Sequence, residues 1–282
     1  MQVNQSDLYN QACFDCSRLI TQKYSTSFSI GIKAFDKHLR PPVYAIYGFV
    51  RLADEIVDTF HQHDKHQLIG EFRQETFKAI EQKISLNPIL QSFQLVVNQY
   101  QISHDLIDSF LCSMEMDLDK KLHDQESYQT YIYGSAEVIG LMCLKVFCSG
   151  DDKEYARLLP AARSLGSAFQ KVNFLRDVKS DLEDRGRTYF PEVDFGNFTE
   201  QDKRLIEADI KKDFDAGFDG IKQLPQGTRL GVYIAYIYYL QLFKKIIGLS
   251  AATVLQKRIR VSDTRKLSLY CKALVQQKLK LI

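Results

Sequence analysis

Hydrophobic and polar positions follow the period of an α-helix along most of this chain. Apolar residues recur three and four positions apart in long segments, and polar runs or prolines separate these segments. Pro41 and Pro42 indicate a helix start, because proline is tolerated in the first helical turn. The hydroxyl-rich stretch 24–28 is predicted to end the first helix. Helices are predicted over residues 5–23, 44–60, 67–82, 88–100, 104–121, 127–147, 151–184, 199–221, 227–249 and 264–280.

Composition supports an all-α fold. The chain has 282 residues, of which 45% are hydrophobic, and it contains only 14 Gly and 6 Pro. Such a composition suits long helices with short connections better than a strand-rich fold. No linker rich in Pro, Gly or Ser divides the chain, so we predict a single domain over residues 1–282. The most apolar run, 230–240, is shorter than the roughly 20 residues that span a bilayer, which predicts a buried helix.

Charge and cysteine content narrow the functional classes. The net charge is +2 and acids are mixed with bases, so no nucleic-acid partner is expected. Residues 257–280 are the exception, because basic side chains concentrate there. A solvated helix face is the favoured interpretation, and contact with an anionic membrane is the alternative. Six scattered cysteines without a signal-peptide pattern predict a cytoplasmic protein. The lone Cys13-x-x-Cys16 and the His-rich loop 61–66 are not interpreted as metal sites.

Two predicted helices carry acidic residues on faces where packing alone would disfavour them. In the first, Tyr47, Arg51, Asp54 and Asp58 lie at i, i+4, i+7 and i+11, so they share one face. The second helix has a one-sided polar stripe of four residues: Gln170, Asn173, Asp177 and Asp181. Each aspartate pair is a like-charge i, i+4 pair, unfavourable by about 0.2–0.5 kcal/mol. A cation is therefore expected between the two stripes.

The spacing Asp-x-x-x-Asp is informative only in context, because it occurs elsewhere in the chain. Two pairs in a lysine-flanked amphipathic segment are interpreted as a solvated face: Asp209/Asp213 and Asp215/Asp219. The pairs in the two stripes differ, since apolar runs flank them and each has an arginine nearby, Arg51 or Arg176. Burying a carboxylate without a partner costs several kcal/mol. A metal or anion site is therefore favoured, and a buried Arg–Asp network is the structural alternative.

Oxygen ligands without His or Cys indicate a hard cation, Mg²⁺ or Mn²⁺. Such ions commonly bind through carboxylates and substrate phosphates, and Arg51 and Arg176 could bind phosphate oxygens directly. A metal-held diphosphate in an apolar cavity suits departure of diphosphate from an allylic carbon. Ring faces such as those of Phe28, Tyr47 or Tyr238 could stabilise the resulting carbocation. Hydrolysis is less favoured, because it requires a wet site and a positioned base.

Five motifs follow one another along nearly the whole chain. They are Ser25-Thr-Ser27-Phe28, Tyr47-x-x-x-Arg51-x-x-Asp54-x-x-x-Asp58, Tyr131-Ile-Tyr-Gly-Ser-Ala-Glu-Val-Ile-Gly140, Asn173-Phe-Leu-Arg-Asp177-x-x-x-Asp181 and Gly186-Arg-Thr-Tyr189-Phe-Pro191. Together they resemble the squalene/phytoene synthase family. The resemblance implies an isoprenoid synthase fold with helices around a central apolar cavity. It also implies head-to-head condensation of two prenyl diphosphates through a cyclopropylcarbinyl diphosphate intermediate.

The resemblance implies a role for each matching residue. The implied Mg²⁺ ligands are Asp54, Asp58, Asn173, Asp177 and Asp181. The implied diphosphate contacts are Ser25, Ser27, Arg51, Arg176, Arg187 and Arg265. Further substrate contacts are implied for Phe28, Tyr47, Gln170, Tyr189 and Tyr238, and Tyr131 and Tyr189 resemble tyrosines near the second ionisation. Glu137 departs from the family, which more often has Gly or Ala there. Pairing with Lys145 or a nearby arginine is its favoured explanation.

The favoured product is phytoene from two geranylgeranyl diphosphates, because stretches 140–147 and 186–191 look more like bacterial phytoene synthases. A squalene or dehydrosqualene synthase using farnesyl diphosphate is the alternative. Head-to-tail prenyltransferases and terpene cyclases typically show a doubled Asp or an Asn-Ser/Thr-Glu triad, which the corresponding helices lack. A non-catalytic assembly factor of the same fold would have lost metal ligands, whereas all four aspartates are present. A greasy product and a basic carboxyl-terminal region also suggest peripheral contact with the inner membrane surface. No oligomeric state is indicated.

Overall fold

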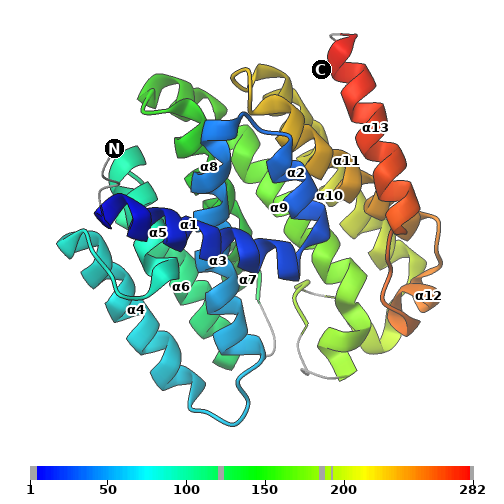
Figure 1. Ribbon diagram of the computed structural model, residues 1–282. Coiled ribbons are helices and arrows are strands. Elements are labelled where there is room, and N and C mark those ends of the chain that lie inside the picture. Colours follow the sequence, from blue (N-terminus) through cyan, green and yellow to red (C-terminus); the bar gives the residue numbers. More distant parts are fainter. Residues whose placement is uncertain (1–4, 120–123, 184–187, 192, 280–282) are drawn as a thin grey trace.

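A computed structural model describes residues 5–119, 124–183, 188–191 and 193–279. Every regular element in these ranges is helical, as predicted (Figure 1). The elements are α1 (Gln5–Tyr24), α2 (Thr26–Lys33), η1 (Lys37–Leu39), α3 (Arg40–Asp58), α4 (Lys65–Gln82), α5 (Pro88–Tyr100), α6 (His104–Asp119), α7 (Gln125–Ile132), η2 (Tyr133–Glu137), α8 (Val138–Cys148), α9 (Asp152–Glu183), η3 (Phe195–Asn197), α10 (Glu200–Gln223), α11 (Arg229–Ile247), α12 (Ala251–Gln256) and α13 (Asp263–Lys278).

Three features depart from the predicted helices. The hydroxyl-rich stretch that was expected only to end the first helix also starts α2, because Ser25 Oγ accepts a hydrogen bond from the Phe28 amide at 3.2 Å. The helix predicted over 127–147 is divided by η2, a π-helical turn of five residues. The helix α12 has six residues, too few for a helical period to be visible in the sequence.

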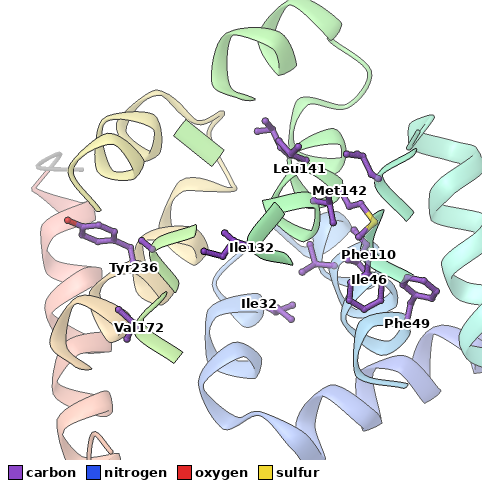
Figure 2. Close-up of a cluster of buried hydrophobic side chains, with 14 of the residues drawn as sticks. Ile32, Ile46, Phe49, Phe110, Ile132, Leu141, Met142, Val172 and Tyr236 are labelled. Carbon is purple, nitrogen blue, oxygen red and sulfur yellow. The ribbon is translucent and has the colours of Figure 1, made fainter. Parts of the chain in front are cut away.

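A cluster of aromatic side chains fixes the position of α3. The fully buried Phe49 stacks on Phe93 of α5, with ring centroids 3.9 Å apart. Its ring centroid lies 5.4 Å from that of Phe110 of α6. Figure 2 shows Phe49 and Phe110 beside each other, with Ile46 and Met142 close by. Because this face of α3 is held in the core, the polar stripe of the helix must face elsewhere.

The long helix α9 is in contact with much of the molecule. It packs along α10 and α8 and also contacts η2, α11 and α12. In Figure 1, α13 lies at the edge of the helical assembly, on the opposite side of the view from α4 and α5. It packs against α11. The second polar stripe is therefore carried by a helix that several neighbours hold in place.

One helical stretch of the described residues, Gln125–Cys148, is long and apolar enough to cross a membrane by length and composition. Inside the protein, 72% of its most apolar window is buried, as for a core helix. The apolar run in α11 is also buried in large part, as predicted, through Tyr233, Ile234 and Ile237 among others. All six cysteines are free thiols.

Candidate active site

A cavity of about 820 Å³ lies between α3 and α9 and is also lined by residues of α2, α8 and α11. Along α3 its lining changes from Val43 and Ile46 to Arg51, Asp54 and Asp58. The lining residues of α9 change in the same direction, from Leu158, Ala161, Ala162 and Leu165 to Arg176, Asp177 and Asp181. The cavity therefore has an apolar end and a charged end. Between Val43 and Asp58 the helix rises by about 22 Å.

All four residues of the α3 stripe line this cavity. The Arg51 guanidinium lies 3.8 Å from an Asp54 oxygen, forms an ion pair with Glu55, and lies over the Tyr24 ring, 4.3 Å from its centroid. Burial raises the pKa of Tyr47 to about 12, so this phenol is neutral at physiological pH. The Tyr47 side chain thus presents a neutral aromatic surface next to a charged one.

All four residues of the α9 stripe line the same cavity. Asp177 lies between two guanidinium groups: Arg176 Nη2 donates to Oδ2 at 2.5 Å, and Arg258 Nε lies 2.8 Å from Oδ1. Asn173 Nδ2 donates to Gln170 Oε1 at 3.2 Å. The Asn173 Oδ1 atom is buried and has no hydrogen-bond partner among the described residues. An unsatisfied buried acceptor is unfavourable, so this oxygen is suited to a ligand that supplies positive charge or a proton.

The donor set of the two stripes fits a hard cation. Carboxylate oxygens from both helices reach one cavity, and the Asn173 carbonyl adds a further neutral oxygen. Guanidinium groups, however, contact Asp54 and Asp177. Within the described ranges, no three acidic, His or Cys side chains gather closely enough to hold a metal. The Arg–Asp pairing weighed as a structural alternative is therefore present, and a bound cation would have to displace part of it.

A hydrogen-bonded group of buried residues forms another part of the wall. Tyr131 Oη donates to Asp117 Oδ2 at 2.9 Å, and Tyr189 Oη donates to Asp117 Oδ1 at 3.4 Å. The two tyrosine rings stack with centroids 5.2 Å apart, and Phe174 stacks on Tyr189 at 4.1 Å. Burial, followed by the charge of Asp117, raises the pKa of Tyr131 well above its ordinary value. Tyr131 is thus a neutral group, and one carboxylate fixes the orientation of both tyrosines.

Comparison with known proteins matches this arrangement to one family. The model of the squalene/phytoene synthase family matches residues 21–265, which include both stripes and the whole cavity lining. The chain belongs to this family. Its members are prenyltransferases that condense prenyl diphosphates head to head, and the predicted resemblance is confirmed at this level.

Curated relatives in the family carry phytoene synthase names at low identity. The 15-cis-phytoene synthase of a Synechocystis species is 26% identical over 91% of this chain and 83% of its own length. The phytoene synthase of Arthrospira platensis is 24% identical over 83% of each protein. The chain spans only 32% of the bifunctional lycopene cyclase/phytoene synthase of Blakeslea trispora, with 27% identity over 61% of this chain.

Solved structures confirm the fold. A dehydrosqualene synthase superimposes with a TM-score of 0.81 at 21% identity, covering 95% of this chain and 98% of that one. A squalene synthase from Alicyclobacillus acidocaldarius gives a TM-score of 0.74 at 20% identity, covering 86% and 95%. The predicted isoprenoid synthase fold is therefore correct.

Most of the site residues expected from the family resemblance lie together. Thirteen described positions line the cavity: Ser25, Phe28, Tyr47, Arg51, Asp54, Asp58, Tyr131, Gln170, Asn173, Arg176, Asp177, Asp181 and Tyr189. Arg187 lies outside the described residues. Ser27, Tyr238 and Arg265 are not among the lining residues, so their predicted substrate contacts have no support from this geometry. Arg265 instead donates to Gln241 at 3.2 Å on the surface.

The tyrosine of α11 that lines the cavity is Tyr239 and not Tyr238. Its ring stacks on Phe169 with centroids 4.0 Å apart and lies 6.4 Å from Phe28. Successive helical residues point about 100° apart, so an error of one residue moves a side chain away from the cavity. Sequence reasoning also missed Arg258 and Asp117. Arg258 follows a short helix and carries no periodic signal. Asp117 lies at i+11 from Leu106, on the face that Leu106 and Phe110 share, and an acidic residue on this apolar face was a signal that could have found it.

The assignment of the pair Asp209/Asp213 to a solvated face is correct only in part, because the Asp209 side chain is 55% exposed and the Asp213 side chain only 20%. Lys171 of α9 is buried, and its Nζ donates to Asp209 at 2.5 Å and to Asp213 at 2.8 Å. The pair Asp215/Asp219 does lie on an exposed face, where its partners are Lys211 and Lys222. The flanking lysines in the sequence could not distinguish Asp209/Asp213 from Asp215/Asp219, because Lys171, the partner of the first pair, lies on another helix.

Glu137 pairs with an arginine, as favoured. Arg163 Nε donates to Glu137 Oε2 at 2.5 Å, and its guanidinium carbon lies 5.1 Å from the centroid of the Tyr133 ring. Tyr133 and Glu137 are the first and last residues of the π-helical turn, so one side chain contacts both ends of it. Lys145, the other partner considered, pairs with Asp152 at 2.8 Å. Burial raises the pKa of Glu137, and Arg163 partly opposes this effect.

Replacing Arg163 and replacing Glu137 should lower the free energy of unfolding by different amounts. Arg163→Met leaves a buried carboxylate without its main donor and is expected to lower the free energy of unfolding by about 1–3 kcal/mol. Glu137→Gln leaves Arg163, whose side chain is 47% exposed, free to reach water, so a loss below about 1 kcal/mol is expected. A raised acid pKa in the folded state makes stability fall as pH rises through it. The Arg163→Met deficit should therefore be larger at pH 8 than at pH 5 in urea denaturation. Equal losses in both variants would contradict this account.

Proposed function

We propose that the chain joins two geranylgeranyl diphosphates head to head to form phytoene, through a cyclopropylcarbinyl diphosphate intermediate. The observation that supports this proposal most directly is the convergence of both acidic stripes on the charged end of one otherwise apolar cavity. Relatives named phytoene synthase, matched over most of the chain, favour the longer substrate. Synthesis from farnesyl diphosphate is the second candidate. A 4,4'-diapophytoene synthase from Staphylococcus haemolyticus, 24% identical over 69% of this chain and 67% of its length, favours it.

The proposed division of labour follows the polarity of the cavity. Asp54, Asp58, Asp177, Asp181 and Asn173 would hold Mg²⁺, with Mn²⁺ as a substitute. The bound metal would stabilise the charge that grows on the leaving diphosphate. Three arginines of the charged end would bind diphosphate oxygens, because guanidinium groups match them in shape and charge: Arg51, Arg176 and Arg258.

The apolar end of the cavity would protect the reacting carbons. Between the apolar and the charged end, Phe28, Phe169 and Tyr239 form a chain of neighbouring rings at the cavity wall, and the faces of such rings attract positive charge. Apolar walls also exclude water, which would otherwise capture a carbocation. Tyr131 and Tyr189 would be held in place by Asp117, so that their hydroxyl groups keep one orientation during the second ionisation.

A product assay with both substrates tests this proposal. Purified protein is incubated with Mg²⁺ and either the C15 or the C20 diphosphate, with and without NADPH, and hydrocarbons are extracted. A C40 product from the C20 substrate supports phytoene synthesis, and a C30 product alone supports the second candidate. Release of a prenyl alcohol without coupling, or absence of turnover with both substrates, would contradict head-to-head condensation.

Metal removal should abolish this activity. Chelation with EDTA is expected to lower turnover by at least about 100-fold, since bound metal commonly supplies several kcal/mol of charge stabilisation. Added Mg²⁺ or Mn²⁺ should restore it. Binding provides a second readout: inorganic diphosphate should raise the melting temperature with Mg²⁺ present and have little effect after chelation. Stabilisation that is equal with and without metal would assign diphosphate binding to the arginines alone.

A further inference from the structure

The outward face of α13 exposes a row of apolar side chains among polar ones. Leu267 is 62% exposed and Val275 is 55% exposed, and Leu279, directly after the helix, is 64% exposed. Cys271 lies between the first two and is exposed as well. These residues are spaced at i, i+4, i+8 and i+12, so they form one stripe on one side of the helix. We call the side chains of Leu267, Cys271, Val275 and Leu279 the outer stripe.

The opposite face of α13 is what attaches this helix to the protein. Leu269 and Ala273 are buried there. Tyr233 Oη of α11 donates to Gln276 Oε1 at 3.0 Å. Leu267, Val275 and Leu279 of the outer stripe remain more than half exposed, although large apolar side chains in water are unfavourable. An exposed apolar surface of this kind, rimmed by charge, is typical of an interaction site.

Basic residues are concentrated in the stretch of sequence that carries the outer stripe. Between positions 257 and 278 the basic residues are Lys257, Arg258, Arg260, Arg265, Lys266, Lys272 and Lys278, and Asp263 is the single acidic residue. Lys272 and Lys278 belong to α13 and are exposed, as are Lys257 and Arg260 in the connection before it. Arg258 and Lys266 are partly neutralised by Asp177 and Asp263. The surface therefore combines apolar side chains with a strong excess of positive charge.

We propose that the outer stripe and its basic rim bind the surface of an anionic lipid bilayer. A helix with one apolar face and basic flanks can lie in the headgroup region, with its apolar side chains among the acyl chains and its lysines near lipid phosphates. A second copy of the chain is a poorer occupant. Two-fold pairing through this face would bring the same basic rims together, and like charges oppose association. The position of α13 at the edge of the molecule leaves room for a flat surface (Figure 1).

A single introduced tryptophan can test this proposal, because the chain contains no Trp. Cys271→Trp places the only indole in the centre of the outer stripe. Vesicles with 30% phosphatidylglycerol should shift its emission to shorter wavelength, and brominated acyl chains should quench it. Vesicles of phosphatidylcholine alone should have little effect. The matched control is Leu86→Trp, at a site 92% exposed between α4 and α5, which should show neither effect.

Charge and apolar variants separate the two contributions. In the Cys271→Trp background, Lys272→Glu with Lys278→Glu is expected to weaken partitioning into anionic vesicles at least about tenfold, because each basic residue near such a surface contributes appreciably. Leu267→Ser with Leu279→Ser should abolish quenching by brominated chains. Circular dichroism before lipid addition establishes that each variant is folded.

Three results would overturn the proposal. The first is an unchanged emission with anionic vesicles. The second is an equal response to neutral vesicles, which would remove the role of the basic rim. The third is a blue shift that grows with protein concentration without lipid, which would identify a second copy as the occupant. These measurements use no prenyl substrate, so their outcome is independent of the proposed synthase activity.

Discussion

Asp177→Asn is expected to reduce prenyl transfer by at least about 1000-fold, and Asp54→Asn should have an effect of the same order. Each substitution removes a negative charge from the proposed metal site, and loss of a single charge-stabilising group already costs about 100–1000-fold in other enzymes. The double substitution should be little worse than either single one. Residues that act as one unit give effects that are far from additive. Single-turnover measurements with saturating substrate would determine the loss in the chemical step.

The chain offers a matched control for this experiment. Asp215 belongs to an Asp-x-x-x-Asp pair of the same spacing, but it lies on the exposed face of α10, with Lys211 as its partner. Asp215→Asn should therefore leave turnover unchanged. Near-normal activity of Asp177→Asn would contradict the proposed metal clamp. Activity lost equally in Asp215→Asn would show that the effect arises from stability and not from the site.

Stability of the ligand-free variants is a separate matter. The sequence alone predicts that removing one aspartate of an i, i+4 pair relieves repulsion and stabilises the protein slightly. The structure changes this expectation for Asp177, whose carboxylate contacts both Arg176 and Arg258. The repulsion is already offset by these ion pairs, and the substitution would leave two guanidinium groups close together. Asp177→Asn should therefore be neutral or slightly destabilising in the absence of ligand.

Much of the fold and the charged part of the site follow from local sequence pattern. The helical period fixes which residues share a face, so Asp54 and Asp58 could be placed on one side of α3 without any tertiary information. The same reasoning placed Asn173, Asp177 and Asp181 together on α9. That the two faces meet was inferred from their charge, because two like-charged pairs among apolar residues call for a cation between them. The family resemblance added the central cavity, since no local pattern determines how distant helices pack.

The errors arose where tertiary contacts decide the outcome. Tyr239 faces the cavity in place of Tyr238, and both positions are tyrosines in an apolar helix that is buried on several sides, so periodicity could not choose between them. Arg258 reaches Asp177 from a connection that pairs with α9 through its backbone: the Ile259 amide donates to the Arg176 carbonyl at 3.4 Å. The π-helical turn begins at Tyr133, and neither its position nor its existence follows from helix propensity.

A contact between two helices, which the sequence does not show, also hid the role of Lys171. Of the substitutions considered, Lys171→Met should lower the stability of the protein most. The side chain of Lys171 is 8% exposed, and its ammonium group is the common partner of Asp209 and Asp213. Ser167 Oγ also donates to Asp213 Oδ2, at 2.9 Å. Replacing the lysine by an apolar residue of similar length keeps the packing but leaves two carboxylates together without a counter-charge.

The expected loss in the free energy of unfolding is about 2–3 kcal/mol. Breaking a fully buried pair would cost more, but Asp209 is 55% exposed and can be solvated. The melting temperature should fall by about 4–10 °C. Lys211→Met is the matched control: this lysine pairs with Asp215 at the surface of α10, and its removal should cost less than about 0.5 kcal/mol. Calorimetry of both variants measures the difference.

A second substitution distinguishes charge from packing as the cause. If the loss in Lys171→Met comes from uncompensated carboxylates, adding Asp213→Asn should restore part of the stability, since a pair removed as a whole costs less than one left half intact. If it comes from packing, the two losses should add. Because Lys171 is not among the cavity-lining residues, turnover well below the melting temperature should stay close to normal in both variants. Additive losses, or a selective loss of turnover at low temperature, would show that Lys171 is not simply the counter-ion of Asp209 and Asp213.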